Sequence, residues 1–448
     1  MSKLQTAQYI ITLLLAANDA RGNWREALDH ANKCRDTGSR DAEAAYATAE
    51  KLGSLEQHEG LALIWNDWGV FRFNLGLYEQ ALPLFQKALG SYAEIHESDG
   101  MQAGFVMHNL AMVKRAIGER TDAERLHLQS LAILEHHLGS SDVSVAQGFS
   151  ELAMLYLDTG RVDQARILMK RALQSGSRAL GPKDEILAAW WVGMSEVDRQ
   201  AGAFDAARFD LNHALDVFPV SQSHQSASMA MVINQQARVE YETRHYSKAR
   251  DYWERALLIL ERIPASNVDD ILGIKVCLAR IQATQGASVE AERALTALVE
   301  TAERVGSVTA LAAALRFLAV SYLERKREDL ALPLLRQSLL LVEQRSGDHS
   351  LSMALGLNEL SRTLLALKLP AEAANFSSKA IAIVGQSTSP APAWVELLAT
   401  HGKVLLKLKL KKESARIFHQ IKEIKEANPQ IPAQTITASE LASAWSNR

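Results

Sequence analysis

Histidines are the residues of this chain whose type first suggests chemistry. His136 and His137 are adjacent, and His108 and His127 precede them in the same part of the sequence. Neighbouring residues on a helix point about 100° apart, whereas the histidine ligands of a metal need i, i+4 spacing together with a carboxylate. We therefore interpret these histidines as residues of a helix surface or a groove, and predict no metal site.

Motifs for catalysis are also missing from the sequence. It contains no G-x-S-x-G nucleophile motif, no phosphate-binding G-x-x-x-x-G-K-[ST] loop and no G-x-G-x-x-G after a strand. Paired carboxylates such as Asp269-Asp270, or Glu423 with Glu426, stand in polar stretches that are typical of solvated helix faces. The sequence predicts that the chain is not an enzyme and needs no cofactor, because function has to be argued from a site.

Composition favours one kind of secondary structure. The 448 residues are 48% hydrophobic and 23% charged, with only 10 Pro. Ala and Leu are frequent and runs of β-branched residues are scarce, so we expect an all-α protein. The net charge of −3 provides no basic field for nucleic acid or an anionic membrane, and we predict neither as a partner.

The compartment is predicted from two features. Cys34 and Cys277 are far apart in the sequence, and we interpret them as free buried thiols of a cytoplasmic protein. The apolar segment Tyr9 to Ala17 (YIITLLLAA) leaves the alternative that it is the core of a signal peptide and that the protein is exported. This segment is too short to span a membrane as a helix.

Small residues recur along the chain in three series that share one register. Steps of 42 residues separate most members of the first series, with one step of 54 at its start and one of 40 near its middle. The first series is Ala27, Ala81, Ala123, Ala165, Ala207, Ala249, Ala291, Ala331, Ala373 and Ala415. Seven residues later stand Ala88, Ser130, Ala172, Ala214, Ala256, Ser338 and Ala380, and twelve residues earlier stand Gly69, Ala111, Ala153, Ser195, Ala237, Ala279, Ala319 and Ser361.

This register predicts about ten helical hairpins, because small side chains on facing helices allow close packing. The chain has to turn five residues before each alanine, at Gly22, Gly76, Gly118, Gly160, Gly202, Arg244, Gly286, Lys326, Lys368 and Leu410. We expect a first hairpin in residues 1–38, an irregular or extra helical insertion in 39–60, nine consecutive hairpins in 61–427, and a Pro-containing tail or capping helix in 428–448. The last hairpin departs from the pattern, with Lys403 and Lys422 where small residues belong.

The repeat resembles a known family. Leu152-Ala153, Leu155-Tyr156, Gly160, Ala165 and Ala172 are similar to the tetratricopeptide pattern, and the 42-residue spacing resembles the kinesin-light-chain type. The loops Leu138-Gly139-Ser140-Ser141-Asp142 and Leu180-Gly181-Pro182-Lys183-Asp184 match that type, and Gly347-Asp348-His349 matches it in part. The resemblance implies a right-handed α-solenoid of antiparallel hairpins, whose concave groove binds protein.

A stripe on the first helix of each hairpin is expected to line this groove. Its members lie three residues before, one after and four after the small residue of that helix. They are Asn66, Val70, Phe73, His108, Met112, Met154 and Leu157 in the early repeats, and Asn234, Arg238, Tyr241, Arg280, Arg316, Asn358 and Arg362 in the later ones. Apolar and Met side chains suit an apolar or helical anchor, and the later arginines and asparagines suit carboxylates and a peptide backbone.

We therefore predict a scaffold that binds an extended or helical peptide of a partner, with an acidic part against the later repeats. A peptide- or ligand-sensing regulatory module that acts on a separate output protein is the alternative. For the stripe itself, the alternative is that its residues pack between hairpins or form ion pairs with neighbouring Glu.

The apolar segment near the N-terminus gives a testable prediction. Leu14, Leu15, Gly22 and Ala27 follow the hairpin register, so we expect Tyr9 to Ala17 to be retained as part of the first repeat helix. Sequencing the N-terminus of protein from the native host measures this directly. A mature chain that starts near Asn18 or Arg21 would show cleavage and export.

Overall fold

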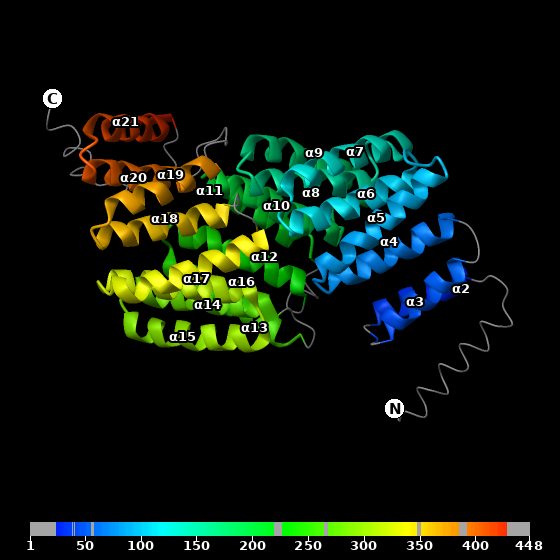
Figure 1. The fold of residues 1–448 in the computed structure, drawn as a ribbon, viewed down its shortest axis with the longest axis horizontal. Helices are drawn as coiled ribbons and strands as arrows, with labels where there is room; N and C mark the ends of the chain where they lie inside the picture. The colour runs from blue at the N-terminus through cyan, green and yellow to red at the C-terminus, as the bar shows by residue number, and fades with distance from the viewer. Residues whose placement is uncertain are drawn as a thin grey trace, which may run out of the picture. The chain divides into compact units, whose positions relative to one another are not determined.

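The protein is seen here as a computed structural model that describes residues 24–37, 39, 41–54, 58–218, 226–263, 268–346, 351–384 and 392–427. All regular secondary structure in these residues is helical, which confirms the predicted all-α class (Figure 1). The chain divides into two compact units, unit 1 (residues 1–139) and unit 2 (residues 140–448).

The helices follow one another along each unit with short turns between partners. Unit 1 contains α2 (Trp24–Asp36), α3 (Ala42–Gly53), α4 (His58–Asn74), α5 (Tyr78–Glu94), α6 (Met101–Ala116) and α7 (Arg120–Leu138). Unit 2 contains α8 (Val143–Asp158), α9 (Val162–Leu180), α10 (Glu185–Gln200), α11 (Phe204–Asp216), α12 (Ala227–Glu242), α13 (Tyr246–Glu261), α14 (Val268–Thr284), α15 (Ser288–Val305), α16 (Val308–Glu324), α17 (Glu328–Ser346), α18 (Leu351–Ala366), α19 (Pro370–Val384), α20 (Pro392–Lys407) and α21 (Lys411–Ala427).

From α4 onward, each even-numbered helix pairs with the next as a hairpin, and the predicted small residues lie in the contact. Every alanine of the first series from Ala81 to Ala373 is fully buried. Where serine replaces alanine, its hydroxyl reaches the backbone of the facing helix: Ser130 Oγ donates to the carbonyl of Gly104 at 2.7 Å, and Ser338 Oγ to that of Ala312 at 2.8 Å. The helices of a hairpin therefore approach closely enough for side chain and backbone to touch, as the register predicted.

The turn between the paired helices has one conformation throughout. The residue five before each alanine from Ala81 to Ala373 has a positive φ, among the glycines from Gly76 at 75° to Gly286 at 93°, and its neighbours close the helix with backbone hydrogen bonds such as Leu77 N to Arg72 O at 2.9 Å. Arg244, Lys326 and Lys368 adopt the same left-handed conformation at 66°, 57° and 62°. Because such a φ strains residues with a Cβ, the rest of the hairpin has to hold these three turns in place.

The register of the last hairpin differs from the prediction by one residue. The left-handed turn is at Lys409 rather than Leu410, and the fully buried small residue is Ser414 rather than Ala415. Ser414 Oγ donates to the carbonyl of Gly402 at 2.8 Å, so Gly402 takes the place assigned to Lys403. The one-residue shift places small residues at Ser414 and Gly402, whereas the position predicted at Lys422 becomes the buried Ile421, so this hairpin still departs from the pattern there.

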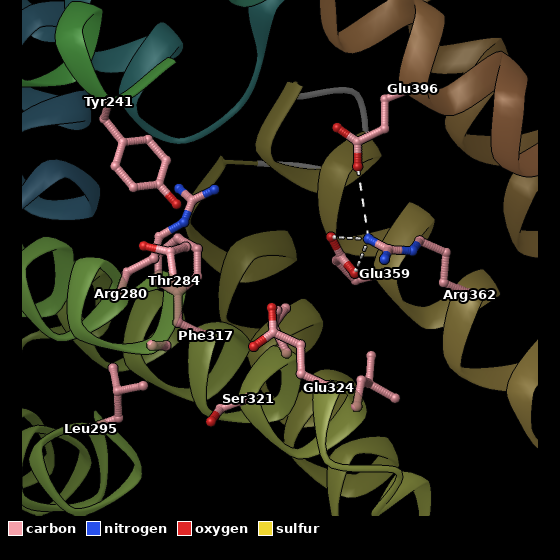
Figure 2. A pocket seen from close by; sticks show the side chains of 13 residues that line it. Tyr241, Arg280, Thr284, Leu295, Phe317, Ser321, Glu324, Glu359, Arg362 and Glu396 are labelled. Atoms are coloured by element: carbon pink, nitrogen blue, oxygen red, sulfur yellow. Dashed lines mark hydrogen bonds and ion pairs between the residues drawn. The ribbon is translucent and has the colours of Figure 1, made fainter. Parts of the chain in front are cut away.

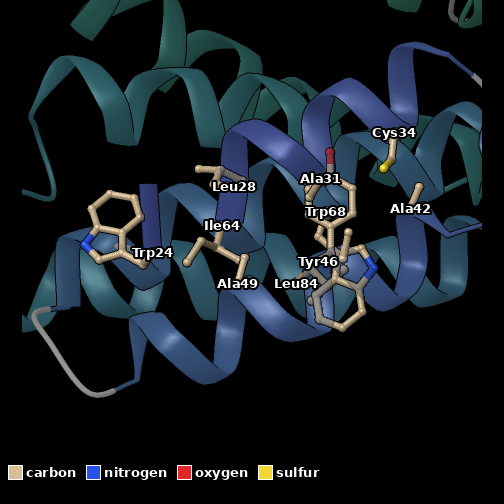
Figure 3. Close-up of a cluster of buried hydrophobic side chains, with 11 residues drawn as sticks. Trp24, Leu28, Ala31, Cys34, Ala42, Tyr46, Ala49, Ile64, Trp68 and Leu84 are labelled. Atoms are coloured by element: carbon tan, nitrogen blue, oxygen red, sulfur yellow. The ribbon is translucent and has the colours of Figure 1, made fainter. Parts of the chain in front are cut away.

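Unit 1 begins with a hydrophobic cluster built by α2, α3 and α4 (Figure 3). Tyr46 on α3 is fully buried, its ring stacks at 6.2 Å on Trp68, and its hydroxyl donates to Asn32 Oδ1 at 2.6 Å. Residues 42–53 of the predicted insertion thus form a packed helix. The predicted turn at Gly22, the segment from Tyr9 to Ala17, the Gly347 loop and the tail 428–448 lie outside the described residues.

Two further observations concern the described helices and the cysteines. Over the part of the chain that the structure covers, no helix is long and apolar enough to cross a membrane. Both thiols, Cys34 and Cys277, are free.

The contact between α9 and α10 gives a stability prediction. Gly176 lies against the ring of Trp190, and a Cβ at this position would overlap that ring. Trp190 is 2% exposed and donates from Nε1 to Gln147 Oε1 at 3.0 Å, so it has no room to withdraw. We expect Gly176→Ala to lower the free energy of unfolding by about 1–3 kcal/mol, measured by chemical denaturation followed by circular dichroism.

Gly273 provides the matched control for this substitution. It lies inside helix α14 of the same unit, and a Cβ there would meet nothing within 4 Å. Gly273→Ala is expected to raise stability by about 0.5–1 kcal/mol, because alanine loses less backbone entropy in a helix. Equal effects of the two substitutions would contradict the close contact at Trp190.

Candidate functional site

A cleft of about 320 Å³ lies in unit 2 among side chains from the first helices of five successive hairpins, α12, α14, α16, α18 and α20 (Figure 2). One residue of a second helix, Leu295 of α15, also lines it. The remaining lining residues are Tyr241, Arg280, Ala283, Thr284, Phe317, Val320, Ser321, Leu323, Glu324, Glu359, Arg362 and Glu396. The first helices therefore form a polar cleft of the kind that the repeat register predicted for a groove.

Arginine and aromatic rings occupy one end of the cleft. The guanidinium of Arg280 lies over the rings of Tyr241 and Phe317, 4.4 and 4.5 Å from their centroids. Within the part of the chain that the structure describes, no carboxylate pairs with Arg280. The two rings fix its position, so its donors are available to an anion without further ordering.

Arg316 lies beside this end, with its guanidinium 4.5 Å from the centroid of the Phe317 ring. Burial lowers the pKa of Arg316, and the nearby charge of Arg280 lowers it further, while Glu359 and Glu396 oppose the shift. The two arginines therefore repel each other across Phe317, and an anion bound there would reduce the repulsion.

Carboxylates dominate the other end of the cleft (Figure 2). Arg362 Nη1 lies 3.1 Å from Glu359 and 3.8 Å from Glu396, so one cation serves two carboxylates. Burial and then the charge of Glu359 raise the pKa of Glu396, and Arg362 counteracts this. Glu324 also lines the cleft and has no ion-pair partner among the described residues. This end attracts positive charge.

The stripe predicted from the sequence contributes Tyr241, Arg280 and Arg362 to the cleft. Arg238 instead lies 3.7 Å from Glu196, which also pairs with Arg199 at 2.6 Å. Burial tends to raise the pKa of Glu196, but Arg199 and Arg238 outweigh it and lower that pKa to about 2. Arg238 thus belongs to an ion network between α10 and α12.

Of the stripe members three residues before the small residue, two asparagines form hydrogen bonds within the repeats and a third is buried without a partner in the described chain. Asn234 Oδ1 accepts a hydrogen bond from Trp253 Nε1 at 2.8 Å, across its own hairpin. Asn66 Oδ1 accepts one from Asn109 at 2.9 Å, on the next first helix. Asn358 is 1% exposed, and neither atom of its amide has a partner in the described chain.

The remaining members of the stripe pack in their own units. Val70 and Phe73 lie against the hydrophobic cluster around Phe85 in unit 1. Met112 in unit 1 and Met154 in unit 2 are half-buried. The apolar groove predicted for the early repeats stays a prediction.

His108 faces a second histidine from its own hairpin. Its ring lies edge-on to that of His127, with centroids 5.3 Å apart. His127 is fully buried, and neither of its ring nitrogens has a hydrogen-bond partner in the described chain. Burial lowers the pKa of His108 to about 4, and burial, His108 and Arg115 together lower that of His127 to about 3, so both rings are neutral at pH 7.

A buried carboxylate pair was not predicted from the sequence. Asp198 on α10 and Asp210 on α11 are 6% and 5% exposed, and Arg166 on α9 lies 2.6 Å from Asp198. Burial and the neighbouring Asp198 raise the pKa of Asp210 to about 8. This cluster links three helices and is closed to a substrate. Elsewhere in the described residues, no group of three or more His, Cys, Asp or Glu could hold a metal ion.

Several cleft residues lie outside the predicted stripe: Phe317, Ser321, Glu324, Glu359 and Glu396. Phe317 and Glu359 stand two residues before the small residue of their helix, and Glu324 stands five after it. The positions two residues before, one residue after and five residues after the small residue follow i, i+3, i+7 spacing, so they share one face of the helix. The sequence contained this face, but the predicted stripe was displaced toward the seam between the two helices of a hairpin.

Comparison with known proteins identifies the repeat. A family model described as "Tetratricopeptide repeat" matches residues 60–136 and 144–219. The chain is 25% identical over 287 residues to Protein KINESIN LIGHT CHAIN-RELATED 2 of Arabidopsis thaliana, which covers 64% of this chain and 41% of the plant protein. It is 27% identical over 142 residues to a clustered mitochondria protein homolog of Neosartorya fischeri, covering 31% of this chain and 11% of that protein.

Among solved structures, BtubC (BKLC) from P. vanneervenii is similar, with a TM-score of 0.39, 16% identity, and coverage of 51% of this chain and 91% of that one. The chain spans less than half the length of the two curated relatives. The matched segments are tetratricopeptide repeats, and the predicted family and its kinesin-light-chain-like type are confirmed.

The buried histidine pair gives a prediction on pH dependence. In the unfolded chain, histidine titrates near 6.5, whereas the folded pKa values of His108 and His127 are about 4 and 3. As pH falls below 6.5, the unfolded state binds protons that the folded state rejects, so stability is lost progressively between about pH 6.5 and 4. We expect His127→Leu to reduce this loss, measured by denaturation of the full chain at pH 7 and pH 5.

His136→Leu on the same helix is the control, because His136 is exposed. It should leave the pH dependence as in the wild type. If both variants keep the wild-type difference between the two pH values, the burial of neutral His127 is refuted.

Proposed function

We propose that this tetratricopeptide-repeat chain is a non-catalytic scaffold that holds a peptide segment of a partner protein in the groove formed by its first helices. The observation that supports this most directly is Arg280, held between the rings of Tyr241 and Phe317 at the cleft and without a carboxylate partner in the described residues. Fixed donors beside half-buried aromatic rings suit recognition of a carboxylate on an extended segment.

The arrangement of the cleft favours a peptide over a compact ligand. Its lining comes from five successive first helices, so a bound segment would run across several repeats rather than sit within one. Tetratricopeptide arrays expose long curved surfaces of this kind, in which each repeat adds a few contacts.

The nature of the partner follows from charge. A net charge of −3, and a cleft that contains both arginines and glutamates, favour a protein with an acidic group over nucleic acid or a membrane surface. Free thiols at Cys34 and Cys277 fit the reducing cytoplasm that we propose as the compartment.

Replacing Arg280 tests the function. A displayed library of random peptides, selected on the purified full chain, would provide ligands whose affinity is then measured by calorimetry. Arg280→Met keeps a long side chain between the two rings but removes the charge. We expect it to lower the affinity for the selected peptides about tenfold or more, because one charge-assisted hydrogen bond is lost. The remaining binding should depend less on salt concentration.

Arg293→Met is the matched control, because Arg293 is exposed on α15, a second helix, and does not line the cleft. It should bind the selected peptides as the wild type does, and both variants should keep the helical spectrum. Selected peptides that bind all three proteins equally would place recognition outside this cleft.

A further inference from the structure

The charges around the cleft are balanced in number but separated in space. Arg280 and Arg316 lie at the aromatic end, Glu359 and Glu396 share Arg362 at the other end, and Glu324 stands between the two groups (Figure 2). A purely acidic segment would meet the three carboxylates, and a purely basic one would meet the two arginines. The complementary ligand carries both signs.

We propose that the cleft is a dipolar peptide subsite, which takes a carboxylate of the partner at Arg280 and a lysine or arginine side chain at Glu324 and the Glu359–Glu396 pair. The inference rests on the proposed function and specifies the ligand of the same groove. It changes the expectation from an acidic segment to one in which an acidic and a basic residue stand a fixed distance apart.

The acidic end is short of positive charge. Glu359 and Glu396 share Arg362, and Glu324 has no ion-pair partner in the described part of the chain. The side chain of Glu359 is 15% exposed and that of Glu396 is 44% exposed, so water screens this group only in part. A basic side chain entering here would add a second cation for three carboxylates, and Glu324 would be its first unshared acceptor.

A buried polar group between the two ends also lacks a partner. Ser321 lines the cleft and is 2% exposed, and its hydroxyl forms no hydrogen bond with any described residue. A buried hydroxyl is normally satisfied, and this one lies beneath the surface of the cleft.

Apolar side chains also line the cleft. Val320 and Leu295 line the cleft together with the ring of Phe317. They suit a residue with an apolar side chain between the acidic and the basic residue of the segment, because burying it would exclude water from both ion pairs.

The test uses a displayed library of random peptides, selected on the full chain as wild type, Arg280→Met, Glu324→Lys and the control Glu300→Lys. Glu300 is exposed on α15 and does not line the cleft. We expect wild type and control to enrich peptides with an acidic and a basic residue at a constant separation. Glu324→Lys should lose the preference for the basic residue and keep the acidic one, and Arg280→Met should do the converse.

A double-mutant cycle then measures the contact. Replacing the basic residue of a selected peptide by norleucine should weaken binding to the wild type about tenfold, and should change binding to Glu324→Gln by much less. Circular dichroism of each variant checks that it folds. Since Glu324 is exposed and unpaired, Glu324→Gln should leave the spectrum unchanged.

The outcomes separate the two proposals. Enriched peptides that depend on Arg280 but contain no basic residue would overturn the dipolar subsite and leave the scaffold function standing. Equal weakening of the norleucine peptide on wild type and Glu324→Gln would also overturn it. Selections in which no variant differs from the wild type would overturn the proposed function and this inference together.

Discussion

The close approach of paired helices at their small residues is the constraint on which the rest of the structure depends. A Cβ on Gly69 would lie 2.8 Å from the ring of Phe85, and Ser361 Oγ reaches the carbonyl of Ala373 at 2.9 Å. At such contacts a single added methylene group destabilises the fold, because protein interiors are packed as densely as crystals of small molecules. The spacing of each hairpin is therefore set by residues that have little or no side chain, and larger side chains have to lie on either side of them.

That constraint sorts the first-helix residues into two sets. Of the side chains three residues before the small residue, Asn234 binds Trp253 and His108 meets His127 in the seam, whereas Arg316 lies at the ring of Phe317. Of those one residue after it, Arg280 and Arg362 line the cleft. A polar residue in the seam has to find its partner inside the repeat, whereas a polar residue on the cleft face remains free to bind something else.

The arginines of the stripe show how much depends on neighbours. Arg238 is drawn into the ion network of Glu196, Arg362 is shared by two glutamates, and Arg280 is held by aromatic rings alone. All three have the same charge and the same place in the repeat. Of the three, only Arg280 has no carboxylate partner in the described chain. Its hydrogen-bond donors are therefore expected to contribute most to binding.

The sequence by itself determined the period, the buried alanines and the turns, because each needs a small side chain or a left-handed residue at a fixed spacing that any helical hairpin repeats. It missed the last register by one residue, since Ala415 beside Ser414 offered two small residues and only packing against Gly402 chooses between them. The cleft was decided by tertiary structure. Glu359 and Glu396 come from different helices, and no local pattern states that they converge on Arg362 and leave Arg280 without a carboxylate partner in the described chain. Spacing along one helix defines a face, but the distance between charges on different helices exists only after the hairpins have packed.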